Sequence, residues 1–173
     1  ATRHHSRPDA GRLGSGFSPA HRLRRLIAFS TSVIVPKAIL DGLETPAYNF
    51  HPGPPTYPGS HAASFALYDG VEHFGATAHV MEEKVDCGPI VAAEWFVVPE
   101  KARFLDLEIK TYELLLKIFA DLVPHLATSD KPLPAIDAQW SGTKHTNAEF
   151  EAMKELKPDM DEAEINLRFR AFG

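Results

Sequence analysis

Residues 47–59, Ala-Tyr-Asn-Phe-His-Pro-Gly-Pro-Pro-Thr-Tyr-Pro-Gly, carry the strongest structural and chemical signal in the chain. The first five residues predict a strand, and the prolines and glycines that follow predict a rigid loop. Asn49 and His51 stand two positions apart, so on a strand their side chains point to the same face. The stretch therefore directs an amide and a titratable imidazole to one point beside a strand end.

A second segment supplies a carboxylate. Residues 84–90, Lys-Val-Asp-Cys-Gly-Pro-Ile, place Asp86 on a turn before an apolar run. An amide, an imidazole and a carboxylate that converge suit acyl-group chemistry. Each side chain also suits a purely structural role, because Asn49 can cap a turn, His51 can be a buried core histidine and Asp86 can form an Asx-turn ahead of Gly88.

Around these segments the chain alternates between strand and helix patterns. We expect strands at 26–30, 47–51, 75–81 and 89–98, and helices at 37–43, 62–68, 104–126 and 161–172. Pro132 and Pro134 mark a linker, and an irregular segment begins at Trp140. Alternation of this kind predicts an α/β sheet with helices on its faces.

The composition narrows the class of protein. The 173 residues are 44% hydrophobic and 24% charged, which is ordinary for one globular domain. A net charge of -5 gives no support for a nucleic-acid surface. A single cysteine and the lack of a long apolar run favour a cytoplasmic protein with no membrane contact. No third ligand accompanies His4 and His5, so we expect no metal.

Three motifs give the chain a family resemblance. In order, they are Asn49-x-His51-Pro52, Gly75-Ala76-Thr77-Ala78-His79 and Asp86-x-Gly88-Pro89-Ile90. Together they resemble the formyltransferases that use 10-formyltetrahydrofolate, which include methionyl-tRNA, glycinamide-ribonucleotide and sugar-amine formyltransferases. The resemblance runs from about Arg25 to Leu126. It implies a Rossmann-like formyltransferase fold, three-layered with a mixed sheet and truncated at its N-terminal side.

The same resemblance implies the site residues. Asn49, His51 and Asp86 are the expected catalytic set, with Asn49 and a protonated His51 stabilising the oxyanion while Asp86 assists proton transfer and keeps His51 cationic. The formyl donor, 10-formyltetrahydrofolate, is expected to contact two loops and an apolar wall, and His79 is expected near the acceptor amine. The residues expected at the donor are Phe29, Ser32, Val33, Ile34, Lys84, Val85 and Asp86.

Two departures from the family pattern bear on function. Gly53-Pro54-Pro55-Thr56 replaces the Ser-Leu-Leu-Pro run of many members. The resemblance also implies a nucleotide-binding-like half before Leu26, where this chain has arginine-rich residues 1–24. We expect a flexible basic lead-in at 1–24, a catalytic domain at 25–128 and a C-terminal linker with a short helix at 129–173. A fragment, a mis-started gene product or a variant completed by another subunit would each fit, and the open sheet edge favours a homodimer.

The predicted function is formyl transfer to an amine. No C-terminal barrel like that of the tRNA-directed members follows in this sequence, so a small-molecule amine is favoured over tRNA as acceptor. Two alternatives remain open from the sequence. One is a hydrolase that releases formate from formyl-tetrahydrofolate, and the other is a non-catalytic folate-binding or interaction module.

Overall fold

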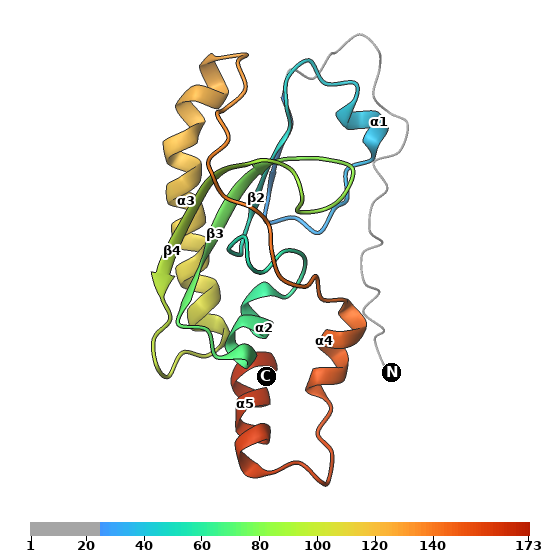
Figure 1. Cartoon of the computed structure of the whole chain (residues 1–173), viewed down its shortest axis with the longest axis vertical. Coiled ribbons are helices and arrows are strands. Elements are labelled where there is room, and N and C mark those ends of the chain that lie inside the picture. The colour runs from blue at the N-terminus through green and yellow to red at the C-terminus, as the bar shows by residue number, and fades with distance from the viewer. Residues whose placement is uncertain (1–24) are drawn as a thin grey trace, which may run out of the picture.

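The computed structural model describes residues 25–173, so the predicted lead-in at 1–24 lies outside the described residues. The described residues form one four-stranded sheet in the order β1-β2-β3-β4 (Figure 1). Its strands are β1 (Ile27–Phe29), β2 (Tyr48–His51), β3 (His73–Val80) and β4 (Ile90–Val97). β1 runs parallel to β2, and the other two pairs are antiparallel. The predicted mixed α/β sheet is confirmed.

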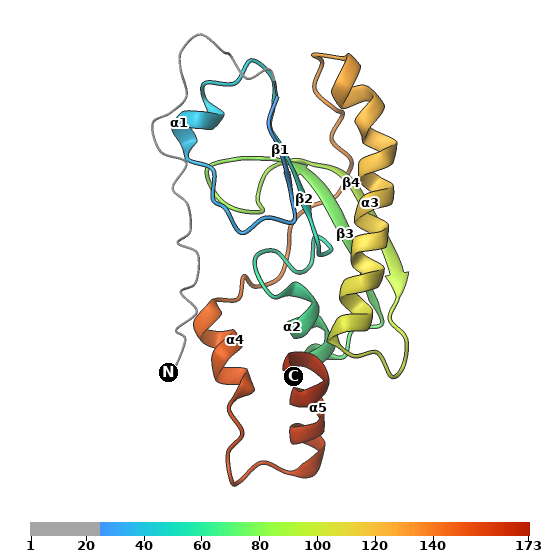
Figure 2. The ribbon, with the colours of Figure 1, turned by 180° about the vertical axis from the view of Figure 1, so that it is seen from behind.

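Five helices accompany the sheet within residues 25–173. They are α1 (Lys37–Leu40), α2 (Ala62–Asp69), α3 (Phe104–Thr128), α4 (Asn147–Lys154) and α5 (Glu162–Phe172). α3 runs along one face of the sheet, while α2, α4 and α5 gather beyond one end of it (Figures 1 and 2). α1 ends three residues before the predicted end. α4 was not predicted, because its region carried only an irregular pattern.

The two faces of β2 have opposite character. Tyr48 and Phe50 are fully buried and pack with Leu115 and Ile118 of α3. Because side chains alternate along a strand, Asn49 and His51 point to the other face. β3 repeats this division, with Ala76 and Ala78 facing the α3 core. Burial of the apolar face therefore fixes which face presents the polar side chains.

The long helix α3 is specified by a capping hydrogen bond at its start and by an apolar stripe along one side. The Asp106 carboxylate accepts a hydrogen bond from the Arg103 backbone N–H at 2.9 Å, which satisfies a donor at the helix start. Leu107, Leu115 and Ile118 recur at helical spacing and are buried. The helix extends two residues past the predicted end at Leu126.

The C-terminal helix packs back onto the middle of the chain. The Phe172 ring lies 5.3 Å from the Phe65 ring of α2 in an edge-to-face contact. The Tyr68 hydroxyl donates to the Glu164 carboxylate at 2.9 Å. α5 therefore completes a second apolar core at the end of the sheet. None of the helices within residues 25–173 combines the length and apolar character needed to cross a membrane.

Candidate active site

The Asp86 carboxylate lies at the centre of a polar cluster below the turn after β3. It is 3% exposed, and its backbone adopts a φ of 44°, a left-handed conformation that non-glycine residues rarely take. Its Oδ2 accepts a hydrogen bond from the Gly59 backbone N–H at 2.7 Å. Its Oδ1 lies 3.1 Å from His79 Nε2, and His51 Nδ1 lies 3.4 Å from Oδ2. Strained, buried and polar geometry of this kind is typical of functional sites.

The charge of Asp86 follows from these neighbours. Burial alone would raise the pKa of the carboxyl group. The hydrogen bond from His79, the nearby His51 ring and the Gly59 N–H together outweigh burial and lower the pKa well below its ordinary value. Asp86 is therefore a carboxylate throughout the physiological pH range.

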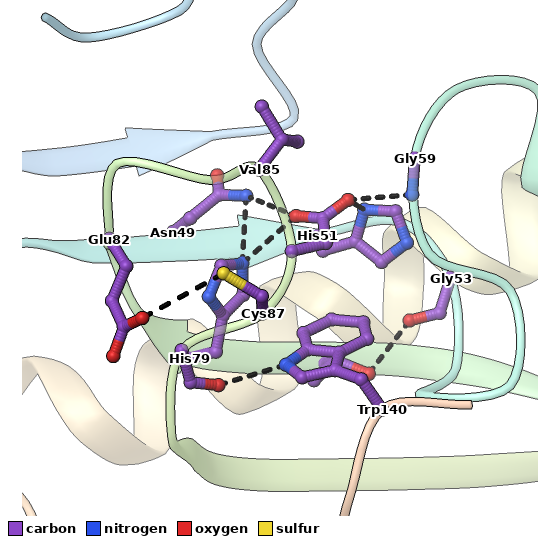
Figure 3. A network of polar contacts seen from close by, with 12 residues as sticks. Asn49, His51, Gly53, Gly59, His79, Glu82, Val85, Cys87 and Trp140 are labelled. Atoms are coloured by element: carbon purple, nitrogen blue, oxygen red, sulfur yellow. Dashed lines mark hydrogen bonds and ion pairs between the residues drawn. The ribbon is translucent and has the colours of Figure 1, made fainter. Parts of the chain in front are cut away.

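The sheet register brings Asn49 and His79 together. These residues stand directly opposite each other on β2 and β3, so their side chains share a face. His79 Nδ1 lies 2.8 Å from the Val80 carbonyl oxygen, and the ring thereby turns Nε2 toward Asp86. Asn49 Nδ2 lies 3.1 Å from the same Nε2 and 3.5 Å from Asp86 Oδ1. Figure 3 shows the network around Asn49, His51 and His79.

His51 is held by a backbone carbonyl. The ring is 4% exposed, and its Nε2–H donates to the Tyr57 carbonyl oxygen at 2.9 Å. Burial lowers the pKa of His51, and the Asp86 carboxylate offsets only part of that effect. This direction favours a neutral His51 over the cationic ring expected from the sequence. In the neutral ring, whose Nε2–H is bonded to Tyr57, Nδ1 carries a lone pair.

Asn49 retains an unmet hydrogen bond. Its Oδ1 is buried and has no partner among the described residues. Rotation of the amide by 180° exchanges the oxygen and the nitrogen, so either orientation leaves one polar atom unpaired. An unpaired buried polar group is costly, and at a functional site it is commonly completed by a ligand.

These side chains line a cavity of about 600 Å³. That volume falls in the range of small-molecule sites, about 300–1,000 Å³. Its walls come from three loops, at 30–35, 59–63 and 81–86, and from one side of α3. Val33, Ile34 and Val85 are 47%, 69% and 46% exposed, so apolar side chains stand free where the loops meet the cavity.

Most of the residues predicted to bind the donor line this cavity, and one does not. The cavity is lined by His79 and by Ser32, Val33, Ile34, Lys84, Val85 and Asp86. Phe29 instead stacks on Phe50, with ring centres 5.7 Å apart, and meets Phe119 edge-on. The structure does not bring Phe29 to this cavity: it pairs in register with Phe50, so it shares the buried face that packs on α3.

The described part of the chain shows no cluster of metal ligands. Within residues 25–173, no group of three or more histidine, cysteine, aspartate or glutamate side chains is arranged to hold a metal ion.

The formyl transferase family model matches residues 26–120, which is more than half of the chain. This chain belongs to the formyl transferase family. The match contains Asn49, His51, His79 and Asp86, and it ends within α3.

Several solved proteins share this fold. A 4-N formyltransferase from Francisella tularensis is 19% identical with a TM-score of 0.72, covering 86% of this chain and 60% of that chain. A sugar N-formyltransferase from Shewanella is 18% identical with a TM-score of 0.72, covering 86% and 59%. HypX from Aquifex aeolicus, in complex with tetrahydrofolic acid, is 20% identical with a TM-score of 0.67, covering 84% and 25%. This chain therefore spans less than two thirds of the length of each of these three proteins.

Backbone groups complete the site and were missed from the sequence. The Gly59 N–H and the Tyr57 carbonyl hold Asp86 and His51 respectively. Such backbone contacts cannot be recognised from residue type, although the proline-rich loop that carries them, residues 52–59, was predicted to be rigid. Trp140 was placed only in an irregular segment, yet its ring lies 5.0 Å from the His79 ring.

Gly53 leaves no room for a side chain beside His51. A Cβ atom there would lie 2.6 Å from His51 Nε2 and 3.0 Å from the Tyr57 carbonyl oxygen. We expect Gly53→Ala to displace the ring and to lower the free energy of unfolding by about 1–3 kcal/mol in urea denaturation. Gly42→Ala is the matched control, because its Cβ would meet nothing closer than 3.5 Å. Equal stability of the two variants would contradict this packing.

Proposed function

We propose that this protein transfers a formyl group from 10-formyltetrahydrofolate to an amine on a small molecule, using Asn49, His51 and Asp86. The observation that carries the proposal is their convergence on one cavity. Asn49 offers an amide with one unpaired buried atom, His51 a lone pair and Asp86 a fixed negative charge. Membership of the formyl transferase family supports this assignment.

The cavity suits a folate-derived donor. Its volume accommodates a flat heterocycle, and Val33, Ile34 and Val85 offer apolar surface where the cavity opens. HypX, whose fold is similar, was solved with tetrahydrofolic acid. Bound formyl-tetrahydrofolate would supply the formyl group and accept one proton on the nitrogen that the formyl group leaves.

Neutral His51 is suited to move that proton. The attacking amine must lose a proton as it bonds to the formyl carbon, and His51 Nδ1 has a free lone pair to accept it. Asp86 Oδ2, 3.4 Å from Nδ1, stabilises the imidazolium that forms. The same Nδ1–H can then return the proton to the leaving nitrogen. This assignment replaces the oxyanion role first expected for His51, which required a ring protonated at rest.

Asn49 is the proposed donor to the developing negative charge. With its amide rotated, an N–H takes the position that now lacks a partner and is available to the formyl oxygen. The amide oxygen then faces His79 Nε2, and the long 3.5 Å contact from the amide N–H to Asp86 Oδ1 is given up. Fixed donors at such an oxygen are usually a large part of catalysis.

We propose a small-molecule amine as the acceptor, of which an amino sugar nucleotide is one example. Two of the similar structures are a sugar N-formyltransferase and a 4-N formyltransferase. The net charge of -5 also argues against a surface built for tRNA.

Formyl transfer is tested by mixing the protein with 10-formyltetrahydrofolate and following tetrahydrofolate release with and without candidate amines. We expect amine-dependent release. Asn49→Ala should reduce turnover about 10²–10³-fold, and Asp86→Asn about 10²–10⁴-fold. Asp41→Asn, which removes an exposed charge paired with Lys37, is the control and should leave turnover unchanged.

The other outcomes separate the alternatives. Formate release without any amine would identify a hydrolase. Saturable folate binding without turnover, for every amine tried, would identify a binding module. Full activity in Asn49→Ala or Asp86→Asn would contradict the proposed roles of those residues.

We also propose that two copies of the chain associate through β1 and α3. Ile27 on the outer strand is 40% exposed, and Leu105, Ile109 and Leu116 on α3 are at least half exposed at helical spacing. The Tyr112 hydroxyl in this stripe is hydrogen-bonded to the Ser30 hydroxyl at 2.5 Å, which links the two surfaces. Light scattering at micromolar concentration should give twice the chain mass, and Leu116→Lys should halve it. One chain mass for the unmodified protein would contradict the dimer.

A further inference from the structure

Residues 140–147 lie beyond the segment matched by the family model, yet they contact both loops that build the site. The Trp140 indole N–H donates to the Gly88 carbonyl oxygen at 2.8 Å, and Lys144 donates to the Val85 carbonyl oxygen. On the other side, the Ser141 N–H donates to the Pro55 carbonyl oxygen at 2.9 Å. This stretch therefore ties the Asp86 turn to the proline-rich loop, and we call it the 140–147 strap.

The strap also approaches the proline-rich loop closely enough to require glycine. Gly142 has a φ of 79°, and a Cβ atom there would lie 2.1 Å from the Thr56 carbonyl oxygen. His145 pairs with Gly59 in a parallel bridge, next to the N–H that holds Asp86. The strap thus supports the backbone group that orients the carboxylate.

Trp140 contacts both site histidines. Its ring is nearly perpendicular to the His79 ring, at 87° with centres 5.0 Å apart. It meets the His51 ring at 71° with centres 5.7 Å apart. Perpendicular aromatic contacts are the favoured geometry for such rings. Figure 3 shows the indole beside the polar network.

These contacts supply what the hydrogen bonds leave undetermined. In each imidazole, one nitrogen meets a backbone carbonyl oxygen, that of Tyr57 for His51 Nε2 and that of Val80 for His79 Nδ1. The other nitrogen of each ring faces Asp86. The torsion that turns an aromatic ring about its bond to Cβ is broad, so ring contacts add a constraint to the one that these polar contacts provide. Trp140 touches both rings and is absent from the residues that line the cavity.

We propose that Trp140 is a positioning residue that fixes the orientation of His51 and His79, held in place by the 140–147 strap. It touches the histidines rather than the substrates, so it acts through them. The catalytic part of this inference rests on the proposed formyl transfer, whereas the orientation of the two rings does not.

The first test changes Trp140 itself. Trp140→Leu removes the ring, and Trp95→Leu removes the chain's other tryptophan, on β4, as the matched control. Side-chain ¹⁵N NMR of the histidines is recorded against pH, together with kcat and KM. Water that reaches His51 in Trp140→Leu should raise its pKa toward the ordinary value of about 6.5. The charges near this ring are Asp86, His79 and Lys144, none of which changes.

For activity we expect kcat to fall about 10- to 100-fold in Trp140→Leu, since misplaced catalytic groups slow the reaction. KM for the formyl donor should stay within about twofold, because Trp140 does not line the cavity. Trp140→Phe should restore most of kcat. Unchanged histidine signals in a folded Trp140→Leu protein would overturn the inference, whatever the activity.

A second pair of variants moves the strap without changing Trp140. Gly142→Ala drives a Cβ into the Thr56 carbonyl, whereas Gly70→Ala carries the same left-handed strain but meets no atom within 4 Å. Only the first should shift the His51 signals; equal effects of the two would overturn the role of the strap.

A measurement on the unmodified protein does not depend on whether the variants fold. It should show nuclear Overhauser contacts from the indole protons to both imidazoles, and their absence would overturn the proposal. If these contacts are present but no amine is formylated, the proposed function fails while the positioning of the histidine pair stands.

Discussion

The site depends on keeping a buried carboxylate ionised. Asp86 is almost fully enclosed, and an unpaired buried charge would cost several kcal/mol. The hydrogen bonds from Gly59 and His79 offset that cost, with His51 close by. They also fix the geometry, because one donor belongs to the proline-rich loop and the other to β3. The left-handed backbone at Asp86, a strain of about 1–3 kcal/mol, persists because these contacts hold it.

This constraint explains how the fold and the chemistry are connected. Burial of Phe50 and Tyr48 against α3 decides that Asn49 and His51 face away from the core. The proline-rich loop then folds back so that its backbone holds both His51 and Asp86. What remains is a neutral imidazole beside a carboxylate and an amide with one open position. Such an arrangement can move a proton and, once the amide turns an N–H to the open position, stabilise an oxyanion.

Local patterns in the sequence predicted the parts that depend on local physics. The two-residue spacing of Asn49 and His51 and the apolar stripe of α3 gave the right elements. Phe29 was assigned to the donor site from the family resemblance, and its short strand has too little alternation to reveal that it packs toward α3. The neutral state of His51 depends on burial, which no motif encodes. Trp140 could not be predicted because its partners, such as Gly88, lie 52 positions away.

The most direct test of this account is a ¹³C NMR titration of the Asp86 side-chain carboxyl in the folded protein. Hydrogen bonds that lower the pKa favour the ionised form, so the stabilisation they provide is present above pH 4 and is lost only at more acidic pH. We predict almost no change in the Asp86 signal on lowering the pH from 7 to 4. An ordinary aspartate, with a pKa of about 3.9, would have completed nearly half of its shift by then. A midpoint at or above pH 4 would contradict the account.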